Sequence, residues 1–177
     1  DDDVIPQHDM IGKMRGVFRS DNRVAGVTGK VLEDGAVGPG LTVEHALAGL
    51  ARSSSSQDNA IVDVFNTYGC NMAFRQDVIR HTAARFDERL PLYAWYEDID
   101  FSRRILPYGR IVRGDGAQGI HLGSKKGKTS GVRLGYSQIV NPLYLARKGS
   151  YLWGNAFRSA GRHTLINGVR SFRPEPW

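Results

Sequence analysis

Three groups of residues carry side chains that can do chemistry, and the first stands at the very start of the sequence. The chain opens with three consecutive aspartates, Asp1, Asp2 and Asp3. At the end of an extended strand, carboxylates two residues apart point the same way, so Asp1 and Asp3 can approach one hard divalent cation. A Mg²⁺ or Mn²⁺ ion held in this way would in turn bind a diphosphate. The competing interpretation is an acidic terminus that holds no ion.

The second group is an acidic triplet, Glu97, Asp98 and Asp100, at the start of an expected helix. The positive end of a helix dipole favours ionised carboxylates, and an ionised carboxylate in a pocket can act as a general base. The alternative is an ordinary acidic first turn, in which Asp100 pairs with Arg103 or Arg104. We favour that alternative for Asp100 and keep Glu97 and Asp98 as candidate catalytic residues.

The third group joins a histidine to a basic loop. His121 follows a short expected strand and precedes the lysines Lys125, Lys126 and Lys128. A neutral imidazole can complete the coordination of a metal ion held by the aspartates, and the lysines can close over phosphate oxygens. The alternative for His121 is a hydrogen-bonded surface residue without a ligand.

The basic loop does not have the spacing of a Walker A motif. That motif needs four residues between its two glycines, whereas three residues separate Gly123 from Gly127. Leu122 also occupies the place where the first glycine of the motif would stand. We therefore exclude a P-loop protein.

The elements that must position these residues alternate between helices and short strands, which predicts an α/β or α+β domain with a mixed sheet. Asp9 is expected to cap the first helix, and Pro142 to interrupt the last one. Residues 114–119 read as a glycine-rich turn. The helices are expected at residues 9–20, 43–50, 77–80, 97–106 and 136–148, and the strands at 23–32, 61–65, 70–74 and 110–113.

Composition restricts the class of protein. With 177 residues, of which 41% are hydrophobic, the chain can build one sizeable core. No apolar run approaches the roughly 18 residues that a membrane-spanning helix needs. The single Cys70 cannot form an internal disulfide, so we expect a cytoplasmic setting. The net charge of +6 suits anionic partners such as phosphate groups.

The order of the motifs resembles family 2 glycosyltransferases, and this resemblance extends from Asp1 to about Gly149. A segment with Asn141-Pro142 and Arg147-Lys148 is similar to the one that follows the histidine in bacterial polysaccharide members. The motifs that carry the resemblance are, in chain order, Asp1-Asp2-Asp3, Gly69-Cys70-Asn71-Met72-Ala73-Phe74-Arg75, Phe86-Asp87-Glu88, Glu97-Asp98-Ile99-Asp100, Gly109 and His121.

The resemblance implies a GT-A fold, a Rossmann-like mixed sheet, and inverting transfer of a sugar from a nucleotide-sugar to an acceptor hydroxyl. It implies that Asp98 is the catalytic base and that Glu97 orients the acceptor or the base. The acceptor would be a saccharide or a lipid-linked saccharide. The remaining site residues would be Asp1, Asp3 and His121 for Mg²⁺ or Mn²⁺, and Asp1, Gly69, Cys70, Asn71, Lys125 and Lys128 for the substrates.

In that family, nucleotide-binding strands precede the aspartate motif, and the sequence has none before Asp1. We therefore expect residues 1–150 to be the C-terminal, acceptor-side part of a catalytic domain. Residues 151–177 would be a basic, aromatic extension. In the transferase interpretation this extension contacts anionic lipid at the inner face of the cytoplasmic membrane, or another subunit.

The competing class is a nucleic-acid or polyanion binder without catalysis. The acidic groups argue against it, because such a protein has no use for converging carboxylates, and we expect no nucleic acid partner. A metal-dependent phosphohydrolase is also disfavoured, because no hydrolase motif is complete. The features in favour of a polyanion binder are the net charge, the lysine loop, and the tail residues Arg158, Arg162, Arg170 and Arg173 interleaved with Tyr151, Trp153, Phe157 and Phe172.

Overall fold

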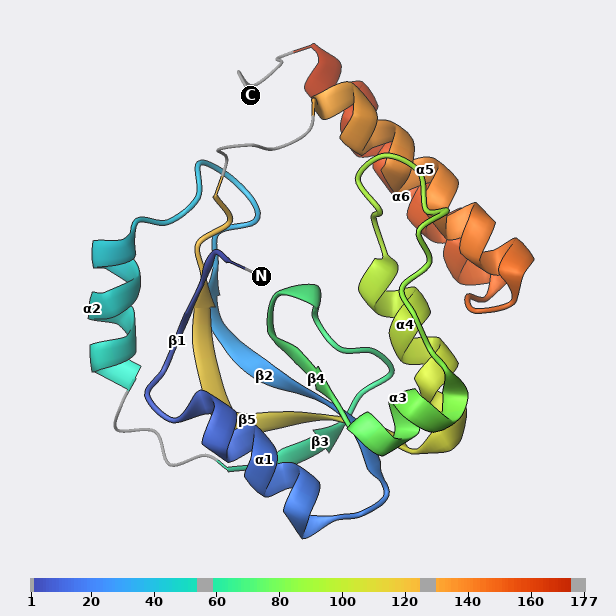
Figure 1. Cartoon of the computed structure of the whole chain (residues 1–177). Helices are drawn as coiled ribbons and strands as arrows, with labels where there is room; N and C mark the ends of the chain where they lie inside the picture. The colour runs from blue at the N-terminus through green and yellow to red at the C-terminus, as the bar shows by residue number, and fades with distance from the viewer. Residues whose placement is uncertain (1, 54–58, 125–129, 173–177) are drawn as a thin grey trace. The chain divides into compact units, whose positions relative to one another are not determined.

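The structure, a computed structural model, describes residues 2–53, 59–124 and 130–172 (Figure 1). The chain forms two compact units. Unit 1 comprises Asp1–Ala84 and Ile105–Lys126, and unit 2 comprises Arg85–Arg104 and Gly127–Trp177. The expected mixed α/β class is confirmed, because unit 1 holds a sheet with both parallel and antiparallel pairs flanked by helices.

The sheet of unit 1 is built around one parallel pair, β2 and β5. The short strand β4 continues the sheet beyond β2, while β1 and β3 both pair with β5, all three antiparallel to their partners. The strands are β1 (Val4–Pro6), β2 (Val24–Asp34), β3 (Ile61–Asp63), β4 (Met72–Phe74) and β5 (Arg110–His121).

The expected break in β5 is wrong. The sequence predicted a short strand at 110–113 followed by a glycine-rich turn, whereas Arg110–His121 is one strand. Gly29 of β2 lies opposite Gly114 of β5, but the next residue of β2, Lys30, lies opposite Gln118. The three residues of β5 in between therefore bulge out of the ladder. Glycines occur in bulges within strands as well as in turns, so the glycines of this segment do not end the strand.

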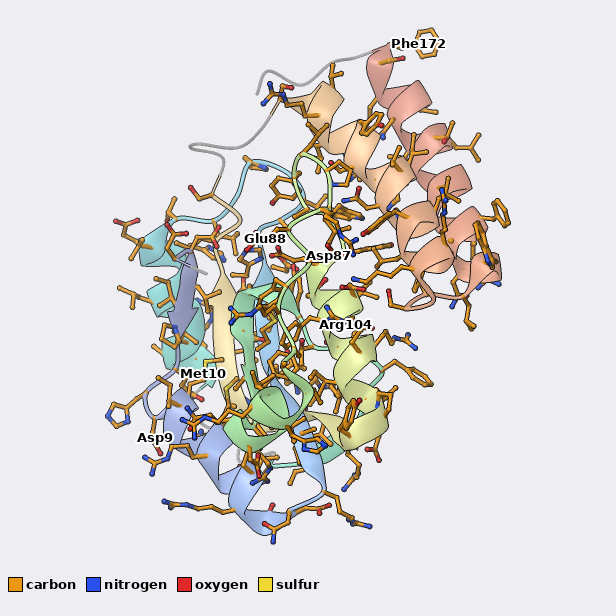
Figure 2. All side chains as sticks on the ribbon, turned by 45° about the vertical axis from the view of Figure 1, so that its right-hand side comes forward. Asp9, Met10, Asp87, Glu88, Arg104 and Phe172 are labelled. Carbon is orange, nitrogen blue, oxygen red and sulfur yellow. The ribbon has the colours of Figure 1, made fainter. Side chains whose placement is uncertain are left out.

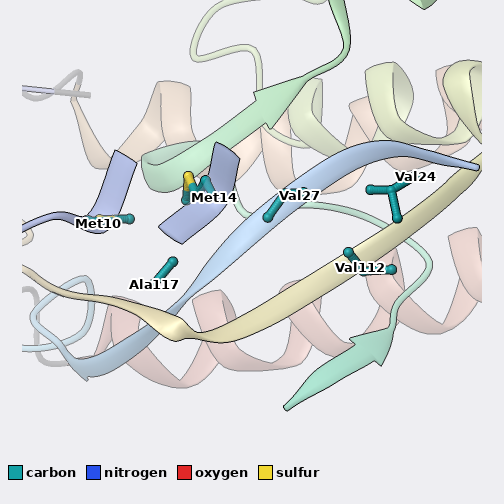
Figure 3. Packing of buried hydrophobic residues seen from close by; sticks show 6 residues of the cluster. All are labelled: Met10, Met14, Val24, Val27, Val112 and Ala117. Carbon is teal, nitrogen blue, oxygen red and sulfur yellow. The ribbon is translucent and has the colours of Figure 1, made fainter. Parts of the chain in front are cut away.

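Two helices supply the core of unit 1. Helix α1 (Met10–Ser20) packs on the parallel pair, where Met10 and Met14 contact valines of both strands (Figure 3). Helix α2 (Val43–Ser53) packs through Ala46 and Leu50 against Ile120 of β5. The cluster under α1 comprises Met10, Met14, Val24, Val27, Val112 and Ala117.

Asp9 occupies the N-cap position of α1 as expected, but it does not cap the helix through its side chain. Asp9 adopts a left-handed conformation with φ of 62°, and its side chain makes no capping hydrogen bond. The strands expected on either side of a turn at 66–69 are present, but β3 pairs with β5 and β4 with β2. A 3₁₀ turn at Gly69–Asn71 precedes β4, and helix α3 (Gln76–Thr82) follows it.

Unit 2 consists mainly of helices. They are α4 (Glu97–Ile105), which ends in a 3₁₀ turn at Leu106–Tyr108, and the pair α5 (Gly131–Lys148) and α6 (Trp153–Ser171). The expected interruption of α5 is wrong: the helix runs through Pro142 and ends at Gly149, whose φ is 92°. Proline costs one backbone hydrogen bond, which the packing of a long helix can offset.

No helix was expected in the basic, aromatic extension at residues 151–177, whereas residues 153–171 form α6, which packs along α5. Ala156 and Ala160 are the buried residues of α6. Since both α5 and α6 belong to unit 2, the boundary between the compact units does not coincide with residue 150. No helix in the described ranges is long and apolar enough to span a bilayer.

Candidate functional site

A polar centre forms at one edge of the sheet in unit 1. The carboxyl ends of the parallel strands β2 and β5 meet there, and their last residues, Asp34 and His121, are register partners. Strand β1 runs antiparallel to β5 and begins at the same edge, with Val4 opposite His121, so Asp3 comes beside them. The carboxyl edge of parallel strands is where open α/β sheets usually bind their ligands.

Both imidazole nitrogens of His121 face carboxylates. Nδ1 lies 2.8 Å from Oδ1 of Asp34, and Nε2 lies 3.2 Å from Oδ1 of Asp3. The Tyr68 hydroxyl donates to Oδ2 of Asp34 at 2.8 Å, and its ring meets the imidazole edge-on. The side chains of His121 and Asp3 are only 10% and 15% exposed, so both are held in a partly enclosed site.

Two glycines allow the loops after β2 and β5 to touch at this centre. Gly35 donates its N–H to the His121 carbonyl at 2.8 Å, and a Cβ on Gly35 would overlap the Leu122 carbonyl oxygen. Gly123 has φ of 61°, where a side chain is strained, and a Cβ there would overlap the Gly35 carbonyl. This close approach fixes Asp34 next to His121.

The Asp34 carboxylate orients the imidazole of His121. Burial alone would raise the pKa of Asp34, but hydrogen bonds from the Ala36 backbone, Tyr68 and His121 outweigh it, so the pKa lies below its ordinary value. An ionised carboxylate only accepts hydrogen bonds, so the imidazole nitrogen facing it, Nδ1, carries the proton. The lone pair of Nε2 is then directed toward Asp3, as in carboxylate–histidine–metal arrangements.

Asp3 and His121 fit a divalent ion in part. Oδ1 of Asp3 is buried and accepts no hydrogen bond from the described residues, although Nε2 of His121 lies close. Two ligand atoms about 2.1 Å from one Mg²⁺ ion and at a right angle lie about 3 Å apart, close to this separation. Oδ2 of Asp3 is held by the backbone N–H of Ser124 at 2.8 Å.

No group of three or more His, Cys, Asp or Glu side chains among the described residues is arranged to hold a metal ion. Asp1, the other expected ligand, lies outside those residues, as do the expected phosphate contacts Lys125 and Lys128. Mg²⁺ commonly binds through one or two protein groups and takes its other ligands from water and substrate phosphates. Asp3 and His121 would be such a pair.

The expected substrate contacts at Gly69, Cys70 and Asn71 belong to the 3₁₀ turn next to Tyr68. Burial, with the charges of Asp34 and Asp3, raises the pKa of Cys70 to about 12, so its thiol stays protonated. Substrate contact by these three residues remains a prediction.

The amide of Asn71 is engaged inside the protein. It accepts a hydrogen bond from the Thr28 hydroxyl at 2.6 Å and donates one to the Gly29 carbonyl at 3.2 Å. These bonds tie the turn at Gly69–Asn71 to β2. The side chain of Asn71 therefore holds the turn in place beside the polar centre.

A cavity of about 420 Å³ adjoins the polar centre within unit 1, and Tyr68 lines it. Its volume lies in the range typical of small-molecule sites. Its wall combines apolar surface with hydroxyl, amide and basic side chains that could bind an anionic or hydroxyl-rich ligand. The lining residues include Thr28, Lys30, Asn66, Thr67, Tyr68 and Arg113.

The acidic pair Glu97 and Asp98 begins α4 in unit 2, as expected. Oδ1 of Asp98 accepts the N–H of Ile99 at 2.8 Å. Although Glu97 is among the exposed residues, enough protein surrounds its carboxyl that burial, with the charge of Asp98, raises its pKa. A carboxyl group with a raised pKa beside a second carboxylate is a frequent feature of acid–base sites.

The segment that leads into this pair is strained. Leu92, Ala94 and Tyr96 have φ angles of 59°, 53° and 74°. Each such non-glycine residue costs about 1–2 kcal/mol, and strain of this kind concentrates at functional sites. The rest of unit 2 must therefore hold this segment in place.

Polar side chains of α5 and α6 fix the strained segment through hydrogen bonds. The hydroxyl of Ser137 donates to the Pro91 carbonyl at 3.2 Å, and the amide of Asn141 donates to the Trp95 carbonyl at 3.0 Å. Both side chains are fully buried. From α6, the Ser159 hydroxyl lies 2.9 Å from the Tyr96 hydroxyl.

A buried ion network anchors α4 itself. Nζ of Lys148 lies 2.6 Å from Oδ2 of Asp87 and 2.7 Å from Oδ2 of Asp100, and Ser150 donates to Oδ1 of Asp100 at 2.6 Å. Asp87 is labelled in Figure 2. Arg104 pairs with Asp100 at 3.5 Å, as the alternative for Asp100 predicted, but Lys148 lies closer. Asp100 is thus a structural residue.

Of the expected site residues, Asp3 and His121 lie next to each other in unit 1. Glu97 and Asp98 form a separate pair in unit 2. Sequence reasoning missed Asp34 and Tyr68. The sequence feature that could have indicated Asp34 is its position just after the strand expected at 23–32. No protein-family model, curated protein or solved structure matches the chain.

Proposed function

We propose that this protein takes part in metal-dependent, inverting transfer of a sugar from a nucleoside diphosphate donor to an acceptor hydroxyl, on a GT-A-type domain. The observation that carries the proposal is the pair of Asp3 and His121, with Asp34 behind the imidazole, at the carboxyl edge of the parallel strands. The order of the sequence motifs, which resembles family 2 glycosyltransferases, adds support.

Asp3 and His121 would hold Mg²⁺ or Mn²⁺, which stabilises negative charge on a diphosphate leaving group when it is bound. Asp34 keeps the Nε2 lone pair of His121 available and fixes the plane of the ring. The Ser124 N–H orients the Asp3 carboxylate through Oδ2. The basic and hydroxyl groups of the neighbouring cavity would bind polar parts of the donor.

Asp98 would act as the general base. It accepts the proton of the acceptor hydroxyl as that oxygen bonds to the anomeric carbon, while the bond from this carbon to the diphosphate oxygen breaks. A single displacement inverts the anomeric centre and needs only one carboxylate. Glu97, whose pKa is raised by burial, would hydrogen-bond the acceptor or the base.

The acceptor class that fits this proposal is a saccharide or a lipid-linked saccharide, as in bacterial polysaccharide or glycolipid synthesis. The alternative, a basic domain that binds nucleic acid or another polyanion without catalysis, gives no role to the carboxylates around His121. It also gives no reason for the strained approach to Glu97.

The test is a panel of nucleotide-sugars with Mn²⁺ or Mg²⁺, scored by acceptor-dependent release of nucleoside diphosphate from the full-length protein. Asp98→Asn should keep donor binding and lose about two to four orders of magnitude in turnover. Asp77→Asn, at an exposed aspartate of α3, is the matched control and should keep full activity. Equal turnover in Asp98→Asn and wild type would remove Asp98 from the mechanism.

A further inference from the structure

Helix α6 exposes a continuous apolar row. Its members recur at every fourth position, with Gly161 between them; residues four apart are neighbours on a helix, and because each step of four turns by about 40°, the row winds around the exposed side of α6. Exposure rises along the row from 50% at Trp153 to 73% at Val169. Phe172, three residues after the row and 87% exposed, projects from the end of the helix (Figure 2). The row consists of Trp153, Phe157, Leu165 and Val169.

A second, basic row runs beside the apolar one. Arg158, Arg162 and Arg170 each follow a position of the apolar row by one residue, and all three are exposed. On a helix this offset places the guanidinium groups along one flank of the apolar row. Long arginine side chains can keep their charge in water while their stems lie on an apolar surface.

The charge of this region has one sign. Residues 130–172 contain no Asp or Glu. Among the basic side chains, Lys148 is the one used by the buried ion network, so the others leave the surface of the helix pair strongly positive. The basic residues in this range are Arg133, Arg147, Lys148, Arg158, Arg162 and Arg170.

Exposed apolar residues also occur at the start of α5. Asn167 of α6 donates to Gln138 of α5 at 3.2 Å, so the start of α5 lies beside the end of α6. Val132 and Tyr136, in the first turns of α5, are both exposed. The surface formed by the apolar row, Phe172, Val132 and Tyr136 is called the α6 face below.

We propose that the α6 face docks on an anionic lipid bilayer, with α6 lying in the plane of the interface. This proposal does not depend on the transferase proposal. A helix with aromatic and aliphatic residues on one side and arginines along its flank, too polar to span a membrane, is the type that binds at the lipid headgroup boundary. Anionic lipids supply the charge that complements the arginines.

Two other occupants fit less well. Leu165 and Val169 have no ring on which a base could stack, so half of the apolar row would make no stacking contact with a nucleic acid. A second copy of the same face would bring two arginine rows together, and juxtaposed like charges oppose such an interface.

The experiment measures co-sedimentation of the full chain with phosphatidylcholine vesicles, with and without phosphatidylglycerol, at low and high salt. We expect binding only when phosphatidylglycerol is present, weakened by salt, with a blue shift in tryptophan fluorescence. The double variant Phe157→Ser/Leu165→Ser should weaken binding at least tenfold. Arg158→Gln/Arg162→Gln should weaken it about tenfold and reduce its salt dependence.

The matched control is Ile11→Ser, which removes an apolar residue of α1 that is 75% exposed and should leave vesicle binding unchanged. Circular dichroism verifies that each variant keeps its helices. The proposal is overturned if vesicles fail to bind, if Phe157→Ser/Leu165→Ser binds like wild type, or if Ile11→Ser loses as much binding. It is also overturned if an oligonucleotide binds where vesicles do not, or if the α6 face instead drives a concentration-dependent dimer.

Discussion

Nδ1 of the His121 imidazole lies 2.8 Å from a carboxylate oxygen of Asp34, the residue at the end of the neighbouring parallel strand. The two residues are far apart in the sequence and adjacent in the sheet. Because the carboxylate fixes both the tautomer and the ring plane, the other nitrogen, Nε2, is directed toward Asp3. Asp34 is therefore the positioning residue of this centre.

Replacement of Asp34 by asparagine should weaken divalent metal binding while the fold is kept. The amide is isosteric with the carboxylate but does not hold the imidazole proton as firmly, and loss of such a partner typically costs 10–100-fold in metal affinity. Titration of the apoprotein with Mn²⁺, followed by electron paramagnetic resonance, measures the affinity directly. Asp77→Asn should bind Mn²⁺ like wild type, and an unchanged affinity in Asp34→Asn would refute the role of Asp34.

The contact between Gly35 and the loop after β5 predicts a cost for any side chain at that position. Gly35→Ala should lower the free energy of unfolding by about 1–3 kcal/mol, because the new methyl group overlaps the Leu122 carbonyl and must displace it. Denaturation by urea measures the loss. Gly16→Ala, in open space on α1, is the control and should be neutral or stabilising. Equal stability of the two variants would mean that the loops do not approach so closely.

The ion network of unit 2 predicts a large effect from a single lysine. Lys148→Met removes the cation that the carboxylates of Asp87 and Asp100 share and leaves them the more exposed Arg89 and Arg104; breaking a buried pair in this way costs up to about 3–5 kcal/mol. Urea denaturation measures the loss. Arg147→Met changes the exposed neighbour of Lys148 on α5 and should cost less than about 0.5 kcal/mol. A loss in Lys148→Met no larger than this would show that the network contributes little.

Glu97 predicts a pH dependence of stability. Because its pKa is raised in the folded protein, mainly by burial, the folded state binds more protons than the unfolded state between the ordinary and the raised value. The free energy of unfolding contributed by Glu97 therefore falls as pH rises through that window and stays low above it. Glu97→Gln should be more stable than wild type at neutral pH and should lose this part of the slope.

Thermal unfolding as a function of pH tests the prediction for Glu97. The control is Glu88→Gln, at an exposed glutamate of the same unit. This variant should keep the wild-type slope. A Glu97→Gln variant that is less stable than wild type at neutral pH would reverse the sign and contradict the prediction.

Local sequence patterns were sufficient for elements with a clear apolar period. Helices α1, α2 and α4 and strand β2 lie close to their expected positions, since each has apolar residues at the spacing of its own secondary structure. Helix α6 escaped prediction because its buried side is formed by small residues such as Ala156 and Ala160. Its larger apolar residues face outward, so the usual amphipathic signal is absent.

The site was predictable only in part, for a different reason. Asp3 and His121 carry recognisable chemistry, whereas the importance of Asp34 depends on the register between two parallel strands. Register is set by the packing of both strands against the core, which no short motif encodes. The strain at Leu92, Ala94 and Tyr96 likewise follows from tertiary packing, because none of these residue types favours a positive φ.

The central pairing of β2 with β5 also constrains how the protein can fold during synthesis. Residues 35–109 separate the two strands, so β2 leaves the ribosome long before its main partner exists. Until then β2 has only the short strand β4 to pair with. Closure of so long a loop is entropically costly and tends to be slow. We therefore expect the nascent chain to stay sensitive to chaperones and proteases until β5 has emerged.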